Sequence, residues 1–290
     1  MRPEQGLEEG ADVGGEKYPT QAIDVATPSV SRMYDFLLGG VENYQSDRDA
    51  CAELLEIAPS TQALARNNRD FLVRVVRTLV EEYGVEQFLD HGSGLPTQNN
   101  VHQVAQRSNR HCRVVYVDND PIVLAHGRTS LEENSLTAVI DEDMRNTDRI
   151  FDHPEVCRLI RPGRRTAALF VSVLHCLPDT GDGREPAAVV KRVRDRLAPG
   201  DFMVICQLVS DDRQVREGVT DLMARATHNT WGRVREPHEV RQYFEGLEIL
   251  EPGLVDVLDW RPDIPPPPQE RRATDWVEWG GLARVRASEM

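Results

Sequence analysis

The residues with the clearest chemical potential surround a pair of glycines near position 93. Residues 88–97 read FLDHGSGLPT, which predicts a strand end, a glycine turn and a helix from about residue 98. Gly92 and Gly94 would let the main chain turn sharply and approach a ligand that a Cβ atom would exclude. The stretch therefore suggests a nucleotide-type site, although a glycine pair alone is more typical of an ordinary strand-to-helix turn.

A second carboxylate ends the next predicted strand. Residues 114–117 are an apolar run followed directly by Asp118. In an open parallel sheet the carboxyl ends of the first two strands lie side by side, so Asp118 can accept hydrogen bonds from ribose hydroxyls. Alone, it would more often be a turn former ahead of Asn119, Asp120 and Pro121. Together with the glycine turn, it indicates a cofactor that contains adenosine.

The charge beside the turn discriminates between two such cofactors. Dinucleotide sites favour Gly-x-Gly-x-x-Gly and a neutral approach to the phosphates, whereas here Thr97 occupies the third glycine position and Asp90 precedes the turn. A carboxylate at Asp90 repels a pyrophosphate and attracts the ammonium group of an amino acid. The pattern therefore favours S-adenosylmethionine over NAD.

Four motifs in order then resemble the class I S-adenosylmethionine-dependent methyltransferases, and more closely the S-adenosyl methyltransferase family once known only as a domain of unknown function. They are residues 28–40, 65–69, 88–97 and 115–121, and the resemblance extends from about residue 28 to the end. One departure is His91, where such enzymes usually have an apolar residue. Two interpretations of His91 are open: a buried neutral histidine with a local partner, or a residue that alters the affinity for the cofactor.

The resemblance implies a set of cofactor-binding residues. Gly92, Ser93 and Gly94 would contact the methionine part, Asp118 the ribose and Asn119 the adenine edge. Asp143 would hold the adenine amino group while Met144 covers the ring, although Asp143 is equally well a solvated acid beside Asp141 and Glu142. From residues 28–84, Arg69 would bind the cofactor carboxylate, or be an exposed helix charge, and Tyr34 is a further polar candidate near a helix end.

The segment after the fourth predicted strand bears on the methyl acceptor. Residues 172–179 read SVLHCLPD and contain neither the Asn/Asp-Pro-Pro-aromatic motif of enzymes that methylate nucleobase amines nor a Pro-Cys nucleophile. They look like the corresponding loop of small-molecule methyltransferases. His175 is a weak candidate for a general base, and a histidine that shapes the pocket is the alternative. An acceptor that is already nucleophilic needs mostly alignment.

Composition narrows the possible partners. The 290 residues carry 34 Lys and Arg against 48 Asp and Glu, a formal net charge of −14, which argues against a broad basic face for nucleic acid. No apolar run approaches the ~20 residues of a membrane span and no signal peptide is evident, so a cytoplasmic protein without a membrane partner is expected. Five scattered cysteines favour free thiols over disulfides or a zinc cluster, and no metal site is expected. The oligomeric state is not predicted.

The elements that must position these residues divide the chain into three parts. Residues 1–27 are expected to be a poorly ordered tail, residues 28–84 a helical cap and residues 85–290 the core. In the cap we expect helices at about 29–38, 47–58 and from 60 to 84, the first ended by Gly39 and Gly40. Apolar runs alternating with helical patterns predict an α/β fold with a Rossmann-like, doubly wound, mostly parallel sheet.

Within the core, strands are expected at 85–89, 114–117, 137–140, 167–174 and 202–208, with closing strands at 247–250, 254–258 and 282–285. Helices are expected at about 185–197, 211–228 and 237–246, and prolines 265–268 should form an exposed connector. The resulting hypothesis is methyl transfer from S-adenosylmethionine to a small-molecule acceptor. A cofactor-binding regulatory protein without catalysis is the alternative, and an NAD-dependent oxidoreductase is a weaker one.

Overall fold

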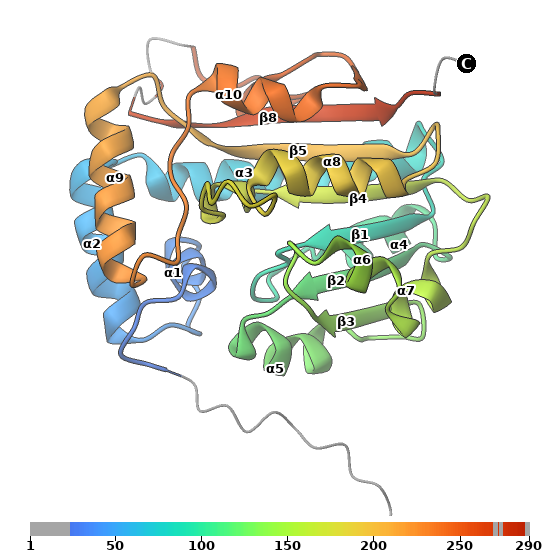
Figure 1. Cartoon of the computed structure of the whole chain (residues 1–290), viewed down its shortest axis with the longest axis horizontal. Helices are drawn as coiled ribbons and strands as arrows, with labels where there is room; N and C mark the ends of the chain where they lie inside the picture. The colour runs from blue at the N-terminus through green and yellow to red at the C-terminus, as the bar shows by residue number, and fades with distance from the viewer. Residues whose placement is uncertain (1–23, 269–271, 273–274, 288–290) are drawn as a thin grey trace, which may run out of the picture.

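The computed structural model describes residues 24–268, 272 and 275–287. Its centre is an eight-stranded sheet with the order β3-β2-β1-β4-β5-β8-β6, and β7 pairs with β8 outside this path (Figure 1). The strands are β1 (Gln87–His91), β2 (Arg113–Asp118), β3 (Thr137–Asp141), β4 (Thr166–Val171), β5 (Phe202–Val209), β6 (Leu247–Ile249), β7 (Val255–Asp256) and β8 (Val277–Val285).

The order of the strands creates a crevice beside β1. This strand pairs in parallel with β2 on one side and β4 on the other, so the chain runs outward to β3 and then returns across β1 to β4 and β5. Ligands of open α/β sheets bind at the carboxyl ends of the strands where the order reverses. Strands β1 to β5 pair in parallel, and of the described strand pairs only those that include β8 are antiparallel. The predicted Rossmann-like, mostly parallel sheet is therefore confirmed.

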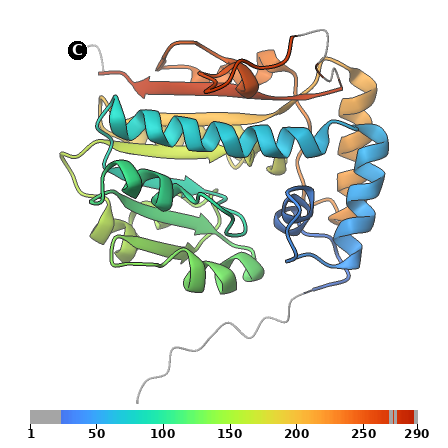
Figure 2. The ribbon, with the colours of Figure 1, turned by 180° about the vertical axis from the view of Figure 1, so that it is seen from behind.

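Helices cover both faces of the sheet, as Figures 1 and 2 show from opposite sides. The helices before β5 are α1 (Val30–Leu37), α2 (Gln45–Ile57), α3 (Thr61–Glu81), α4 (Val101–Ser108), α5 (Pro121–Ser130), α6 (Thr147–Phe151), α7 (Pro154–Leu159) and α8 (Pro186–Arg196). After β5 come α9 (Arg213–Ala226) and α10 (Pro237–Arg241), and three 3₁₀ turns are η1 (Leu174–Cys176), η2 (Gln242–Phe244) and η3 (Val257–Asp259).

The apolar residues of the strands pack into separate clusters on the two faces. On one face, Phe71, Val75 and Leu79 of α3 pack with α4 against β1, β2 and β4. On the other face, α8 packs on β4, β5 and β8, and α6 and α7 cover β2 and β3. The central strands are therefore buried on both sides, which explains why they appear in the sequence as short continuous apolar runs.

A separate helical cap stands beyond the carboxyl ends of the parallel strands (Figure 1). Helices α1 and α2 and the first turns of α3 share one hydrophobic cluster with α9, through residues such as Met33, Leu54, Val219 and Met223. The other end of α3 packs on the sheet, so this helix joins cap and core. The division of the chain at residue 84 remains a prediction.

Two details stabilise the first cap helix. Gly39 takes a φ of +84° and ends α1 as predicted, whereas a Cβ at Gly40 would collide with the Asp35 carboxylate. Asp47 is fully buried and accepts hydrogen bonds from Ser29 N at 2.9 Å, Arg32 Nε at 2.8 Å and Tyr44 N at 2.8 Å. Rather than beginning α2, Asp47 lies inside its first turn and binds it to α1.

Several predicted boundaries differ from the structure for local reasons. The strand expected at 167–174 stops at Val171, because Ser172 has a φ of +57° and η1 follows. The helix expected at 237–246 continues past Arg241 only as η2, and the strand expected at 254–258 is a two-residue β7 followed by η3. The last strand begins at Val277 rather than at residue 282. The predicted start was too late because an acid and glycines interrupt the apolar pattern of this strand.

Two predicted non-regular segments lie at the ends of the described ranges. Of the expected tail, residues 1–23 lie outside the described residues, while Asp24 and Thr27 accept hydrogen bonds from Arg32 through their carbonyl oxygens. Prolines 265–268 form neither helix nor strand, which confirms the expected connector. Over the described ranges, no helix has the length and apolarity needed to cross a bilayer.

We expect Asp47→Ala to destabilise the cap strongly. The substitution leaves the Arg32 guanidinium, whose side chain is 4% exposed, without its carboxylate, and breaking a buried ion pair typically costs about 3–5 kcal/mol. Chemical denaturation should show a loss of unfolding free energy of about 3 kcal/mol. Asp49→Ala removes an exposed carboxylate from the same helix and should change the free energy of unfolding by less than ~0.5 kcal/mol. Equal effects of the two substitutions would contradict this role of Asp47.

Candidate functional site

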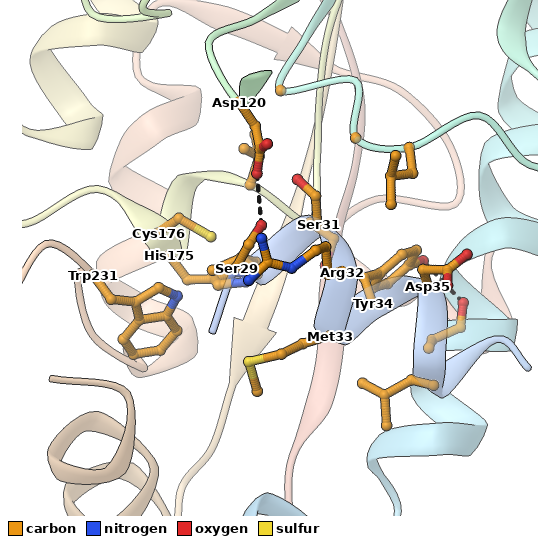
Figure 3. Close-up of a pocket in the computed structure, with 18 of the residues that line it drawn as sticks. Ser29, Ser31, Arg32, Met33, Tyr34, Asp35, Asp120, His175, Cys176 and Trp231 are labelled. Carbon is orange, nitrogen blue, oxygen red and sulfur yellow. Dashed lines mark hydrogen bonds between the residues drawn. The ribbon is translucent and has the colours of Figure 1, made fainter. Parts of the chain in front are cut away.

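A cavity of about 620 Å³ lies between the cap and the carboxyl ends of β1, β2 and β4. Its wall includes residues of α1, α3 and α9, the turns that follow the three strands, and both Trp231 and Trp276. The Ser29 hydroxyl donates to Asp120 Oδ2 at 2.6 Å and joins the start of α1 to the turn after β2 (Figure 3). The cap therefore roofs the crevice that the sheet topology creates.

The glycine turn forms one side of this cavity. Gly92 and Gly94 take φ values of +67° and +66°, so both need the conformational freedom of glycine. A Cβ at Gly92 would collide with the Val173 side chain, whereas at Gly94 no atom lies within 4 Å of that position. Gly92 is thus required for packing against the turn after β4, and Gly94 leaves open space beside the main chain.

The two predicted carboxylates reach the cavity from neighbouring strands. Asp118 accepts hydrogen bonds from Gly94 N at 2.9 Å and Asp120 N at 3.0 Å, so it also fixes the glycine turn. Burial raises the pKa of Asp118 to about 6. Burial raises the pKa of Asp90 to about 7, and the nearby Asp118 adds to this while Arg69 opposes it. These two acids favour a ligand that carries positive charge and hydrogen-bond donors.

Arg69 and Tyr34 enter the same cavity from the cap. Arg69 donates to the carbonyl oxygen of Asn99 at 3.2 Å, which ties α3 to the chain that follows the glycine turn. Tyr34 donates to the carbonyl oxygen of Ala65 and accepts from Asn68 Nδ2 at 2.9 Å. Burial raises its pKa above the usual range, so the phenol keeps its proton at neutral pH.

The predicted adenine contacts divide between cavity and surface. Asn119 and Met144 line the cavity, and Asp143 is absent from its described wall. The Asp143 carboxylate pairs with Arg145 and lies 3.4 Å from Arg184, and the Arg145 hydrogen bonds help to lower its pKa against the effect of burial. In this arrangement Asp143 binds neighbouring arginines rather than facing the ligand space.

Two histidines near the site are neutral at pH 7. His91 is fully buried and stacks on Phe170 at 4.3 Å, and burial lowers its pKa to about 4, so it is part of the core. His175 lines the cavity, but burial and the nearby Arg235 lower its pKa to about 3. Its Nδ1 accepts from Leu208 N at 3.4 Å. These properties favour the pocket-shaping alternative for His175 over a general base.

Sequence reasoning missed two charged residues at this site. Arg235 is 1% exposed and donates to Asp179 and to the Leu177 carbonyl oxygen, which holds the turn containing His175. Glu278 lines the cavity from β8 and is 2% exposed. A final strand predicted to begin at residue 277 rather than 282 would have included Glu278.

The residues present fit a cationic adenosine cofactor. The hydroxyl of Ser93, in the glycine turn, is buried and has no hydrogen-bond partner among the described residues. The Oε2 atom of Glu278, on the same cavity wall, is likewise buried and without a partner among those residues, and Asp90 lines this wall at 7% exposure. Buried polar groups normally have partners, so unsatisfied groups around one cavity indicate that a ligand supplies them.

Comparison with known proteins finds relatives over most of the chain. A protein of Thermobifida fusca, provisionally assigned to the methyltransferases, has 39% identity and a TM-score of 0.82, with 94% of this chain and all of the other covered. A DUF574 family protein of Streptomyces avermitilis has 32% identity and a TM-score of 0.82, over 91% of this chain and all of the other. No match was found among curated protein sequences.

The sheet, its crevice and the carboxylates at the strand ends define a class I S-adenosylmethionine-dependent methyltransferase. The S-adenosyl methyltransferase family model matches residues 16–286, so the chain belongs to that family. Its cofactor is accordingly S-adenosylmethionine. This assignment confirms the resemblance and sets aside the nicotinamide-dependent oxidoreductase.

We expect the affinity for S-adenosylmethionine to rise between pH 5.5 and 7.5. Asp90, with a pKa of about 7, loses its proton over this range and then attracts the cofactor ammonium group. In Asp90→Asn, the midpoint of the pH dependence of binding should move down toward the pKa of Asp118, about 6. Binding should also be weaker at every pH. Calorimetry at four pH values measures both profiles, and an identical pH dependence in the two proteins would contradict this role.

Proposed function

We propose that this enzyme methylates a nucleophilic atom of a small molecule enclosed beneath the cap. The observation that supports the proposal best is the single cavity that contains both the buried acids Asp90 and Asp118 and an apolar chamber roofed by the cap. Cavities of ~300–1,000 Å³ suit ligands of metabolite or drug size. The acidic net charge of −14 also disfavours a nucleic-acid acceptor.

The cofactor would extend along the ends of β1 and β2. In this proposal Asp90 attracts the ammonium group and Arg69 the carboxylate of its methionine part, while Ser93 and Gly94 border the main chain there. Asp118 retains acceptor capacity for ribose hydroxyls beside its two main-chain donors. Asn119 and Met144 border the adenine. Asp143 is not needed, since its carboxylate is paired with arginine.

The protein's part in the reaction is alignment and exclusion of water. The cofactor, when bound, supplies an electrophilic methyl group on a sulfonium. The turns after β1 and β4 then border the reacting atoms, and Tyr34 closes this region from α1. Holding two reactants in line removes much of the entropic barrier. The Ser29–Asp120 hydrogen bond helps to hold the cap over the bound reactants.

Asp118→Ala should abolish most of the cofactor affinity. The substitution removes an acceptor for the ribose and releases the glycine turn, and hydrogen bonds to a charged group contribute ~1.5–3 kcal/mol, so a loss of at least about tenfold is expected. Thermal shift and calorimetry with S-adenosylmethionine measure it, with Asp141→Ala at the exposed end of β3 as the matched control. Unchanged binding in Asp118→Ala would argue against the proposed cofactor position.

Catalysis on a small acceptor is tested with methyl-labelled cofactor. Incubating the protein with a metabolite extract filtered below about 1 kDa should yield a labelled product, and Asp118→Ala should yield much less. Parallel incubation with the retained protein and nucleic acid tests the larger acceptors. Label found only in that retained fraction would contradict the small-molecule proposal, and no label in either fraction would favour the binding protein without catalysis.

A further inference from the structure

Beyond the cofactor position, the cavity contains a buried carboxylate for which the proposed cofactor arrangement has no use. Glu278 lies on β8, lines the cavity and is 2% exposed. One of its oxygens accepts a hydrogen bond from the Ser172 hydroxyl, and the other, Oε2, is buried with no partner among the described residues. A buried carboxylate oxygen is costly to leave unpaired, so its presence beside a ligand cavity needs an explanation.

A chain of contacts places Glu278 close to the glycine turn. Ser172 follows β4, the strand beside β1, and Val173 packs where a Cβ of Gly92 would lie. Ser172 takes a φ of +57°, a conformation that costs a non-glycine residue ~1–3 kcal/mol and is typical of functional sites. The strained residue therefore positions the Glu278 carboxylate next to the expected methionine end of the cofactor.

Much of the rest of the cavity wall is apolar and aromatic. Met33 and Leu37 of α1, Met223 of α9, Trp231 and Trp276 line it, and Figure 3 shows Trp231 together with His175 and Cys176 on one side of α1. The indole Nε1 of Trp276 is buried and unpartnered within the described residues. Trp276 directly precedes β8 and Glu278 lies on it, and both line the cavity. The indole Nε1 of Trp231 is likewise buried and unpartnered there, so the chamber contains two unsatisfied donors and one unsatisfied acceptor.

We propose that Glu278 binds the hydroxyl group of a small, mainly aromatic acceptor and receives its proton during methyl transfer. A hydroxyl can donate to Glu278 Oε2 and accept from an indole N–H, whereas a protonated amine can only donate. This inference rests on the proposed function, because it requires the cofactor to lie along β1 and β2. It identifies the acceptor class and a residue that contacts the acceptor.

The proposed step balances. The acceptor oxygen uses a lone pair to form a bond to the methyl carbon, while the carbon–sulfur bond breaks and its electron pair remains on sulfur. The hydroxyl proton moves to Glu278 Oε2, so the products are a methyl ether, a neutral thioether and a protonated Glu278. Solvent then takes the proton when the cavity opens.

The surroundings of Glu278 allow it to accept a proton near neutral pH. Burial raises its pKa to about 7, the Ser172 and Cys206 side chains oppose this and Asp256 adds to it. The titratable groups that face it come from several elements, and all are neutral or acidic: Tyr34 of α1, Cys176 of η1, Cys206 of β5 and Asp256 of β7. Among the described residues no cation shifts the pKa of Glu278, so no ion pair there occupies its carboxylate.

The test uses three matched probes on the complex with S-adenosylhomocysteine: 2-naphthol, its methyl ether 2-methoxynaphthalene, and 2-naphthylmethylamine. At pH 8 the wild-type complex should bind naphthol about tenfold more tightly than the ether. In Glu278→Gln this preference should largely disappear, and in wild type it should shrink toward pH 6, where the protonated carboxyl can donate to the ether oxygen. Glu248→Gln, an exposed acid on β6, should behave as wild type.

The outcomes separate this inference from the proposed function. S-adenosylhomocysteine should still bind Glu278→Gln, which shows that the variant is folded and that its cofactor site is intact. Equal binding of naphthol and ether to wild type, binding of neither, tighter binding of the amine, or an unchanged preference in Glu278→Gln would each overturn the role of Glu278. Failure of wild type to bind S-adenosylhomocysteine would instead contradict the proposed cofactor site.

Discussion

The site depends on two carboxylates held out of water at the ends of adjacent parallel strands. Burial raises the pKa of Asp90 and of Asp118 above the ordinary value of 3.8. An acid whose pKa is higher in the folded chain binds its proton more tightly there, so the free energy of unfolding falls as the pH rises from about 4 through 6 to 7. At neutral pH the two buried carboxylates therefore lower the free energy of unfolding, and a bound cationic ligand offsets this loss of stability.

The cap produces this burial. In an uncovered α/β sheet the carboxyl ends of the strands face solvent, and both acids would be hydrated. Here α1, α2 and α9 form their own hydrophobic cluster, the buried Arg32–Asp47 pair joins the first two helices, and Arg69 joins α3 to the chain after the glycine turn. The binding crevice of the sheet thereby becomes a partly covered cavity that contains both buried acids and aromatic side chains.

Much of this arrangement was predictable because local sequence determines it. Strands buried on both faces appear as apolar runs, so the ends of β1 and β2 and the acids Asp90 and Asp118 could be found directly. The reason for Gly40 could not, because the space it leaves is filled by Asp35. Nor could the pairing of Asp143 with Arg184 be predicted, since it depends on a loop 41 residues away.

Glu278 was hidden for a different reason. It lies in an antiparallel strand whose apolar pattern is interrupted by Gly280 and Gly281, and a Cβ at Gly280 would collide with the main chain of β5. Because the two strands approach closely, this strand has glycines in place of the apolar side chains by which it would have been recognised. The acid also becomes significant only when Ser172, from the far side of β5, is placed beside it.

The Ser29–Asp120 hydrogen bond joins the roof of the cavity to a wall that borders the expected adenosine position. If the cap moves to release cofactor and product, this hydrogen bond is one of the contacts that must break. The exchange of ligands would then depend on a single short contact between two segments far apart in the sequence, and product release of this kind limits turnover in many enzymes.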